Sequence, residues 1–108
     1  MTRTLDRSVL AAATFGNEEL EHEVLSMFCR QSATALNQLA GTSAPEIQGE
    51  LIHTLKGSAR SVGALDVGDI CQQIEAELAA GRSLDIDLLR SKVEEANREI
   101  SAVLARGV

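Results

Sequence analysis

The 108-residue chain contains no tryptophan or tyrosine, only two phenylalanines, and no run of basic residues. Proteins that bind nucleic acid need cationic surface and often stack bases on aromatic side chains. A formal net charge of −6 would also repel a phosphate backbone. We therefore expect no nucleic acid among the partners of this protein.

Glycine-rich loops of the kind that hold nucleotide phosphates are also absent, since neither G-x-x-x-x-G-K nor G-x-G-x-x-G occurs. A chain of this length is expected to form one domain, residues 1–108, without a separate ATP-binding module. Any phosphoryl group would have to come from another protein. The prediction is a non-enzymatic protein with no cofactor of its own.

No apolar stretch is long enough to cross a membrane, and the first six residues lack the apolar core of a signal peptide. We expect a soluble, cytoplasmic protein that does not bind membranes. Cys29 and Cys71 show no metal-ligand spacing with each other or with His22 and His53. Two reduced, buried thiols and no metal site are predicted.

Apolar residues recur at intervals of three and four over four long segments, and no alternating strand pattern is present. Short connections between these segments predict an all-α fold: an antiparallel up-and-down four-helix bundle with a short extra N-terminal helix. Such a bundle needs no second copy to cover its core, so we expect a monomer. The predicted helix starts are Asp6, Asn17, Ser43, Asp66, and either Ser83 or Asp85.

The apolar stripes predict which faces of the helices point inward. After Asn17 the expected inward residues are Leu20, Val24, Met27, Phe28, Ala35 and Leu39, widened on one side by Leu25, Ser32 and Leu36. In the helix that follows Pro45 they are Ile47, Leu51, Leu55, Ala59 and Val62.

One histidine lies across the helix from this second stripe. At about 100° per residue, His53 is about 160 to 200° from Leu51 and Leu55, so it should face solvent. Gly49 and Gly57 flank it one turn to either side, although glycine inside a helix costs roughly 1 kcal/mol relative to alanine. Two missing side chains would let a bulky group or a partner reach the imidazole.

Lys56 and Arg60 place two cations on the same side of the helix as His53. Cations beside an accessible imidazole suit a phosphoryl group, which is anionic. The alternative is a solvated face paired with nearby glutamates, worth a few tenths of a kcal/mol. The pattern favours phosphate neutralisation for Lys56 and does not decide for Arg60. Ser58 could bond a phosphoryl oxygen or a helix carbonyl.

The segment His53-Thr54-Leu55-Lys56-Gly57-Ser58-Ala59, followed by Val62-Gly63-Ala64, Cys71 and Ile74-Glu75, resembles the signature of histidine-containing phosphotransfer (HPt) domains. The resemblance implies a phosphorelay carrier whose histidine, His53, takes a phosphoryl group from the aspartate of one receiver domain and gives it to another. The implied partners are response regulator receiver domains and a hybrid histidine kinase. Mg²⁺ would be held by the partner.

An imidazole that attacks through one nitrogen must hold its proton on the other. Glu75, on the next helix, is the predicted acceptor for Nδ1–H of His53, which leaves Nε2 free. In the family that the chain resembles, the matching position often holds Gln or Glu bonded to the active histidine. Ile52 and Gly57 are expected to form a small, apolar docking surface, and Gly68 to allow close helix approach.

Two other functions fit the same residues. One is a helical adaptor or decoy that binds receiver or histidine kinase domains without being phosphorylated. The other is the substrate domain of a chemotaxis-type kinase, which shares the His-x-x-Lys-Gly pattern but normally precedes linkers and catalytic domains.

Overall fold

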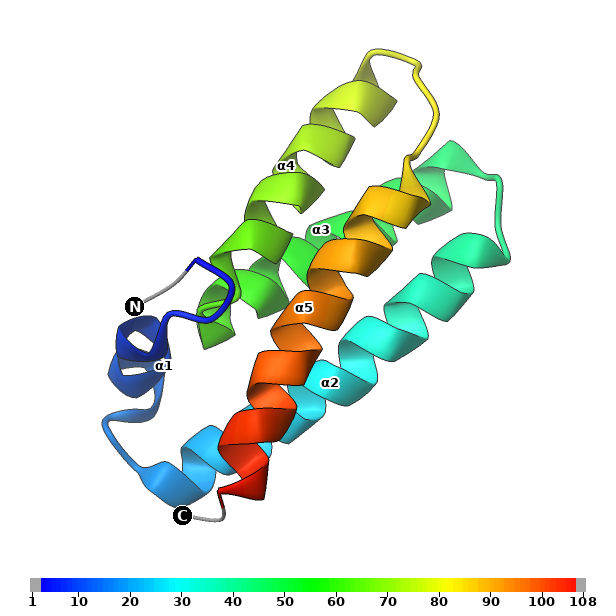
Figure 1. Cartoon of the computed structure of the whole chain (residues 1–108). Coiled ribbons are helices and arrows are strands. Elements are labelled where there is room, and N and C mark those ends of the chain that lie inside the picture. The colour runs from blue at the N-terminus through cyan, green and yellow to red at the C-terminus, as the bar shows by residue number, and fades with distance from the viewer. Residues whose placement is uncertain (1–2, 107–108) are drawn as a thin grey trace.

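The computed structural model describes residues 3–106, and within them the chain forms five α-helices and no strand. The predicted all-α fold is confirmed. The prediction of one domain over residues 1–108 includes four terminal residues outside the described range. The helices are α1 (Arg7–Thr14), α2 (Glu18–Ala40), α3 (Pro45–Val62), α4 (Leu65–Ala79) and α5 (Ile86–Ala105) (Figure 1).

Four of these helices lie side by side as a bundle, and the molecule is elongated, with extents of 44 × 21 × 18 Å (Figure 1). α2 packs against α3 and α5, and α4 packs against the same two helices, so that α3 and α5 lie diagonally across the core. The short α1 packs near one end of the bundle, against α2 and α3. The α3–α4 pair has the most extensive contact of all.

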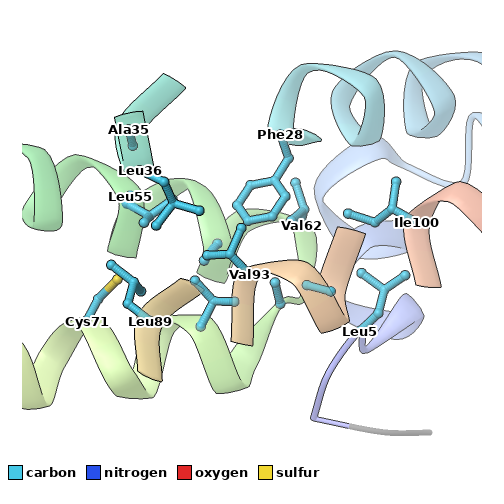
Figure 2. Close-up of a cluster of buried hydrophobic side chains, with 14 of the residues drawn as sticks. Leu5, Phe28, Ala35, Leu36, Leu55, Val62, Cys71, Leu89, Val93 and Ile100 are labelled. Carbon is cyan, nitrogen blue, oxygen red and sulfur yellow. The ribbon is translucent and has the colours of Figure 1, made fainter. Parts of the chain in front are cut away.

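The core between the helices is aliphatic, with Phe28 as its aromatic side chain (Figure 2). Fully burying one side chain of this size contributes about 1.5–3 kcal/mol, so these residues supply the main drive for packing. The largest fully buried side chains are Phe28, Leu10, Leu25, Ile52, Leu89 and Ile100.

The inward faces of α2 and α3 are rotated from those that the sequence predicted. On α2, Leu25 and Ser32 are fully buried, whereas Leu20 and Met27 are 39% and 41% exposed. On α3 the predicted stripe is wrong at Ile47, which is half exposed. Leu55, Ala59 and Val62 are buried as predicted, Leu51 is half-buried, and Ile52 is buried although it was not predicted. The physical reason is that one helix must face two neighbours and α3 turns its face towards α4, its most extensive contact.

Three of the predicted helix starts are confirmed. Side-chain oxygens of Asp6, Asn17 and Asp85 accept hydrogen bonds from backbone amides in the first turns of α1, α2 and α5, which satisfies donors that a helix leaves unpaired.

The other two predicted starts are wrong. α3 begins at Pro45, and its N-cap residue is Ala44, which has no side-chain oxygen to cap the helix. Oγ1 of Thr42 accepts a hydrogen bond from the Ala44 amide just before the helix. α4 begins at Leu65, and Asp66 is already in its first turn.

The N-terminal segment before α1 is hydrogen-bonded to the turn between α3 and α4. The Asp6 amide donates to the Gly63 carbonyl at 2.7 Å, and the Asp66 amide donates to the Arg3 carbonyl at 2.8 Å. The Arg3 guanidinium also pairs with Asp66, at 3.5 Å, and with Asp69. These contacts hold the end of the α3–α4 hairpin.

Both cysteines are free thiols, and they differ in burial. Cys71 is buried in the core, and this burial raises its pKa to about 12, which keeps the thiol protonated and inert. Cys29 is only half-buried, so the prediction of two buried thiols is correct for Cys71 and overstated for Cys29.

The turn at Gly63 generates a stability prediction. Its φ of 86° is left-handed, and a Cβ at this position would overlap the backbone oxygen of Asp6. Gly81 is the matched control, because its φ is 80° but a Cβ there would meet nothing within 4 Å. Gly81→Ala should lower the free energy of unfolding by about 1–2 kcal/mol, the cost of a left-handed alanine.

Gly63→Ala should lower the free energy of unfolding by clearly more than Gly81→Ala does, because the N-terminal segment must also move away from the new methyl group. Urea unfolding of the two variants measures the difference. Equal destabilisation would show that the contact between Asp6 and Gly63 does not contribute.

Candidate functional site

His53 stands on the outer side of α3 with its side chain 73% exposed. Gly57, one turn further along, is open to solvent, and a Cβ there would meet nothing within 4 Å. A Cβ at Gly49 would also meet nothing, although this residue is half-buried. The imidazole is therefore accessible to a large partner group from the Gly57 side.

Glu75 of α4 binds both His53 and Lys56. One carboxylate oxygen, Oε2, lies 3.0 Å from Nδ1 of His53, and the other, Oε1, accepts a hydrogen bond from Nζ of Lys56. The hydrogen bond from Lys56, followed by that from His53, lowers the pKa of Glu75. These contacts stabilise the fold above the usual glutamate pH range, and that contribution disappears as the pH falls through the lowered pKa.

The ionised carboxylate determines where the imidazole carries its proton. A carboxylate can only accept hydrogen bonds, so Nδ1 of a neutral His53 must be the donor, an assignment that follows from the partner. Nε2 then has a lone pair, and it lies on the side of the ring away from Glu75. The arrangement leaves a nucleophilic nitrogen directed away from α4 on an exposed ring.

Lys56 is less available than the sequence indicated. Its side chain is 18% exposed and its ammonium is paired with Glu75. A phosphoryl group on His53 would therefore meet an ammonium whose charge is already balanced by a carboxylate. For Lys56 to contact that group, it would have to share or leave the contact with Glu75.

Arg60 lies one turn beyond Lys56 on α3 and extends across α4. Its guanidinium NH2 donates a hydrogen bond of 2.6 Å to Oε1 of Gln72. Gly68 makes room for this side chain, because a Cβ there would lie 2.9 Å from Cγ of Arg60. Sequence reasoning expected Gly68 to bring the helices close but missed Gln72, whose place opposite Arg60 depends on the register of the two helices.

Ile52 is not part of an accessible docking surface, and that expectation was wrong. Its side chain is fully buried, because it lies three residues before Leu55 and seven before Ala59, on the face that packs into the core. Because successive residues on a helix are about 100° apart, Ile52 faces a different direction from its neighbour His53.

Apolar surface near the site lies instead along the groove between α2 and α3. One hollow of about 330 Å³ is bordered by Leu51, Thr54 and Ser58, and the next, of about 240 Å³, by Met27 and again Ser58. The side chain of Ser58 is thus directed to this groove rather than to His53. A larger hollow of about 560 Å³, between α2 and α5, is lined by none of the predicted site residues.

The chemistry of residues 3–106 bears on metal and membrane binding. Among these residues, no group of three or more His, Cys, Asp or Glu side chains is arranged to hold a metal ion. None of the five helices combines the length and the apolar character needed to cross a membrane.

The family model of the Hpt domain matches residues 23–106 of this chain, which include α3, α4 and every predicted site residue. Comparisons with curated proteins and with solved structures gave no significant match.

The contact between Glu75 and His53 predicts a measurable proton position. With the ring neutral, ¹⁵N NMR of the folded protein should show His53 protonated on Nδ1. Glu75→Ala removes the acceptor and should populate the Nε2–H form, whereas Glu75→Gln keeps one oxygen and should largely preserve the Nδ1–H form.

Glu77→Ala is the control, because it removes a carboxylate from α4 that lies two residues, or about 200° around the helix, from Glu75. An identical ¹⁵N pattern in the Glu75→Ala variant and the unmodified protein would mean that Glu75 does not select the tautomer.

Proposed function

Because the chain belongs to the Hpt domain family, we propose that it is a phosphorelay intermediate that carries a phosphoryl group on Nε2 of His53. Family membership implies involvement in histidine phosphotransfer. The observation that carries the assignment to His53 is its contact with Glu75, which supports an accessible, unprotonated Nε2.

The proposed reaction is an in-line transfer from an aspartyl phosphate of a receiver domain. A bond forms between Nε2 and phosphorus while the bond between phosphorus and the aspartate oxygen breaks, which leaves a free aspartate. The Nδ1 proton stays between His53 and Glu75, so the carboxylate offsets the positive charge that develops on the ring. Transfer to a second receiver reverses these steps.

Divalent cation chemistry belongs to the partner in this proposal. Mg²⁺ held by the receiver would neutralise oxygens of the phosphoryl group in transit. The carrier contributes a positioned imidazole and no cofactor, and we regard it as a phosphoryl carrier rather than an enzyme. Lys56 would contact the phosphoryl group only after giving up part of its contact with Glu75.

We propose that the receiver covers His53 and Gly57 and extends over the groove between α2 and α3. This groove begins beside the site, at Thr54 and Ser58, and ends with the exposed apolar Met27. Apolar surface continuous with a reactive group is typical of a binding face. The partner would be the receiver domain of a response regulator or of a hybrid histidine kinase.

The proposal takes the four long helices as an antiparallel up-and-down bundle, formed by residues 1–108 as one monomeric domain and acting in the cytoplasm. It requires that the His53 face of α3 and the groove between α2 and α3 remain uncovered. An adaptor that binds the same partners without accepting phosphate is the competing function, and the labelling experiment below separates the two.

Substitution of the histidine tests the function directly. Incubation with phosphorylated receiver domains should place an acid-labile label on the protein, and His53→Gln should abolish it while leaving the helical circular dichroism unchanged, because His53 is 73% exposed. His22→Gln is the matched control and should keep full labelling. A protein that binds receivers but is never labelled would be the adaptor.

Added bulk beside the histidine should block docking. Gly57→Leu places a large side chain in open space on the His53 face and replaces a helix-destabilising residue, so folding should not suffer. We expect receiver affinity, measured by calorimetry, to fall at least about tenfold, or about 1.4 kcal/mol.

Ala102→Leu, at an exposed position of α5, is the control and should bind normally. Wild-type affinity in the Gly57→Leu variant would place the docking surface elsewhere.

A further inference from the structure

The two cations of the α3–α4 face differ in how their charges are balanced. Lys56 and Arg60 are the only lysine and arginine in these two helices. Lys56 is paired with the Glu75 carboxylate, whereas Arg60 is bonded to the neutral amide of Gln72. An amide orients a guanidinium but does not neutralise it, so Arg60 carries the uncompensated positive charge of this face.

The position of Arg60 is specified by the helix that it crosses. The missing side chain of Gly68 leaves a space for the arginine, since a Cβ there would lie 2.9 Å from its Cγ and 3.3 Å from its Nε. Gln72, one turn further along α4, then binds the guanidinium at 2.6 Å. A free arginine loses rotamer entropy when it is immobilised, and here part of that loss has already occurred on folding.

This fixed cation faces solvent in a protein whose net charge is −6. Among residues 3–106, no carboxylate lies within ion-pairing distance of Arg60. An acidic protein that binds another acidic protein is slowed by mutual repulsion unless opposite charges meet at the docking face. The geometry fits a cation that receives an anionic group from outside.

We propose that Arg60 recognises an acidic side chain on the docking face of the receiver domain, and that Gly68 and Gln72 are the residues that position it. This inference rests on the proposed phosphorelay function. Arg60 would govern the rate at which the partner docks and which partner is accepted, while His53 carries out the chemistry.

The anion is assigned to the partner's side chain rather than to the phosphoryl group for two reasons. Nε2 of His53 is directed away from Glu75 and hence from α4, whereas the Arg60 guanidinium lies against α4 at Gln72. The seven residues from His53 to Arg60 also separate their backbones by about 10 Å along the helix. A receiver that covers the imidazole would extend over both positions.

The main experiment measures association by stopped flow, using the receiver domain that labels the unmodified protein fastest. Arg60→Gln should lower the association rate constant on the order of three- to tenfold at low salt, and the difference should disappear at high salt, where a single charge is screened. Arg60→Lys keeps the charge and should recover part of the rate. Arg98→Gln, on α5, removes a charge elsewhere and is the matched control.

The positioning residues are tested by combination. Gly68→Ala and Gln72→Ala should each lower the association rate by displacing or releasing Arg60, and neither should lower it further in a protein that already carries Arg60→Gln. A purely structural role would give additive effects instead. Gly68→Ala also replaces a glycine within a helix, so loss of folding is not expected to obscure the result.

A small phosphodonor such as phosphoramidate separates the possible outcomes, because it needs no docking surface. His53 should be labelled by it at the same rate with and without Arg60→Gln. A slower reaction in the variant would mean that Arg60 acts on the phosphoryl group, and the inference would be wrong.

Equal association rates for the variant and the unmodified protein at low salt would also overturn the inference but leave the proposed function intact. Failure of His53 to accept label from any donor would instead refute the proposed function.

Discussion

The candidate site depends on one carboxylate shared between two side chains of the neighbouring helix. Glu75 accepts a hydrogen bond from Nδ1–H of His53 with one oxygen and binds the Lys56 ammonium with the other. The first contact selects the imidazole tautomer, and the second keeps the carboxylate ionised by lowering its pKa. Removing either partner would leave the other with an altered charge environment, so the three side chains act as a unit.

This unit exists only because α3 and α4 are held in one register. Beneath it, Ile52 of α3 and Cys71 of α4 are fully buried, and the left-handed Gly63 closes the hairpin. The N-terminal segment fastens that turn through Asp6. Residues more than fifty positions apart in sequence therefore contribute to the distance between Glu75 and His53, and destabilising the hairpin end should loosen the site.

The same register gives the two cations, Lys56 and Arg60, different partners on α4. The sequence pattern favoured Lys56 as the residue that meets an anion and left Arg60 undecided, because spacing on a helix does not say which acid lies opposite. In the folded chain Glu75 reaches Lys56, and the neutral Gln72 reaches Arg60. Arg60, whose charge is not balanced, is therefore more available to an external anion than Lys56, although Lys56 is nearer to His53 in sequence.

The sequence by itself determined the helical class, the exposed histidine between two glycines, the turn at Gly63 and the choice of Glu75, because these follow from helical periodicity, local conformational preference and a recognisable motif. Only the tertiary structure decided that Ile52 is buried, that Met27 is exposed, and which partners Lys56 and Arg60 have. Periodicity determines the face of a helix to within about one residue of rotation, or about 100°. The neighbouring helices determine which part of that face is covered, because each helix must pack against two others at once.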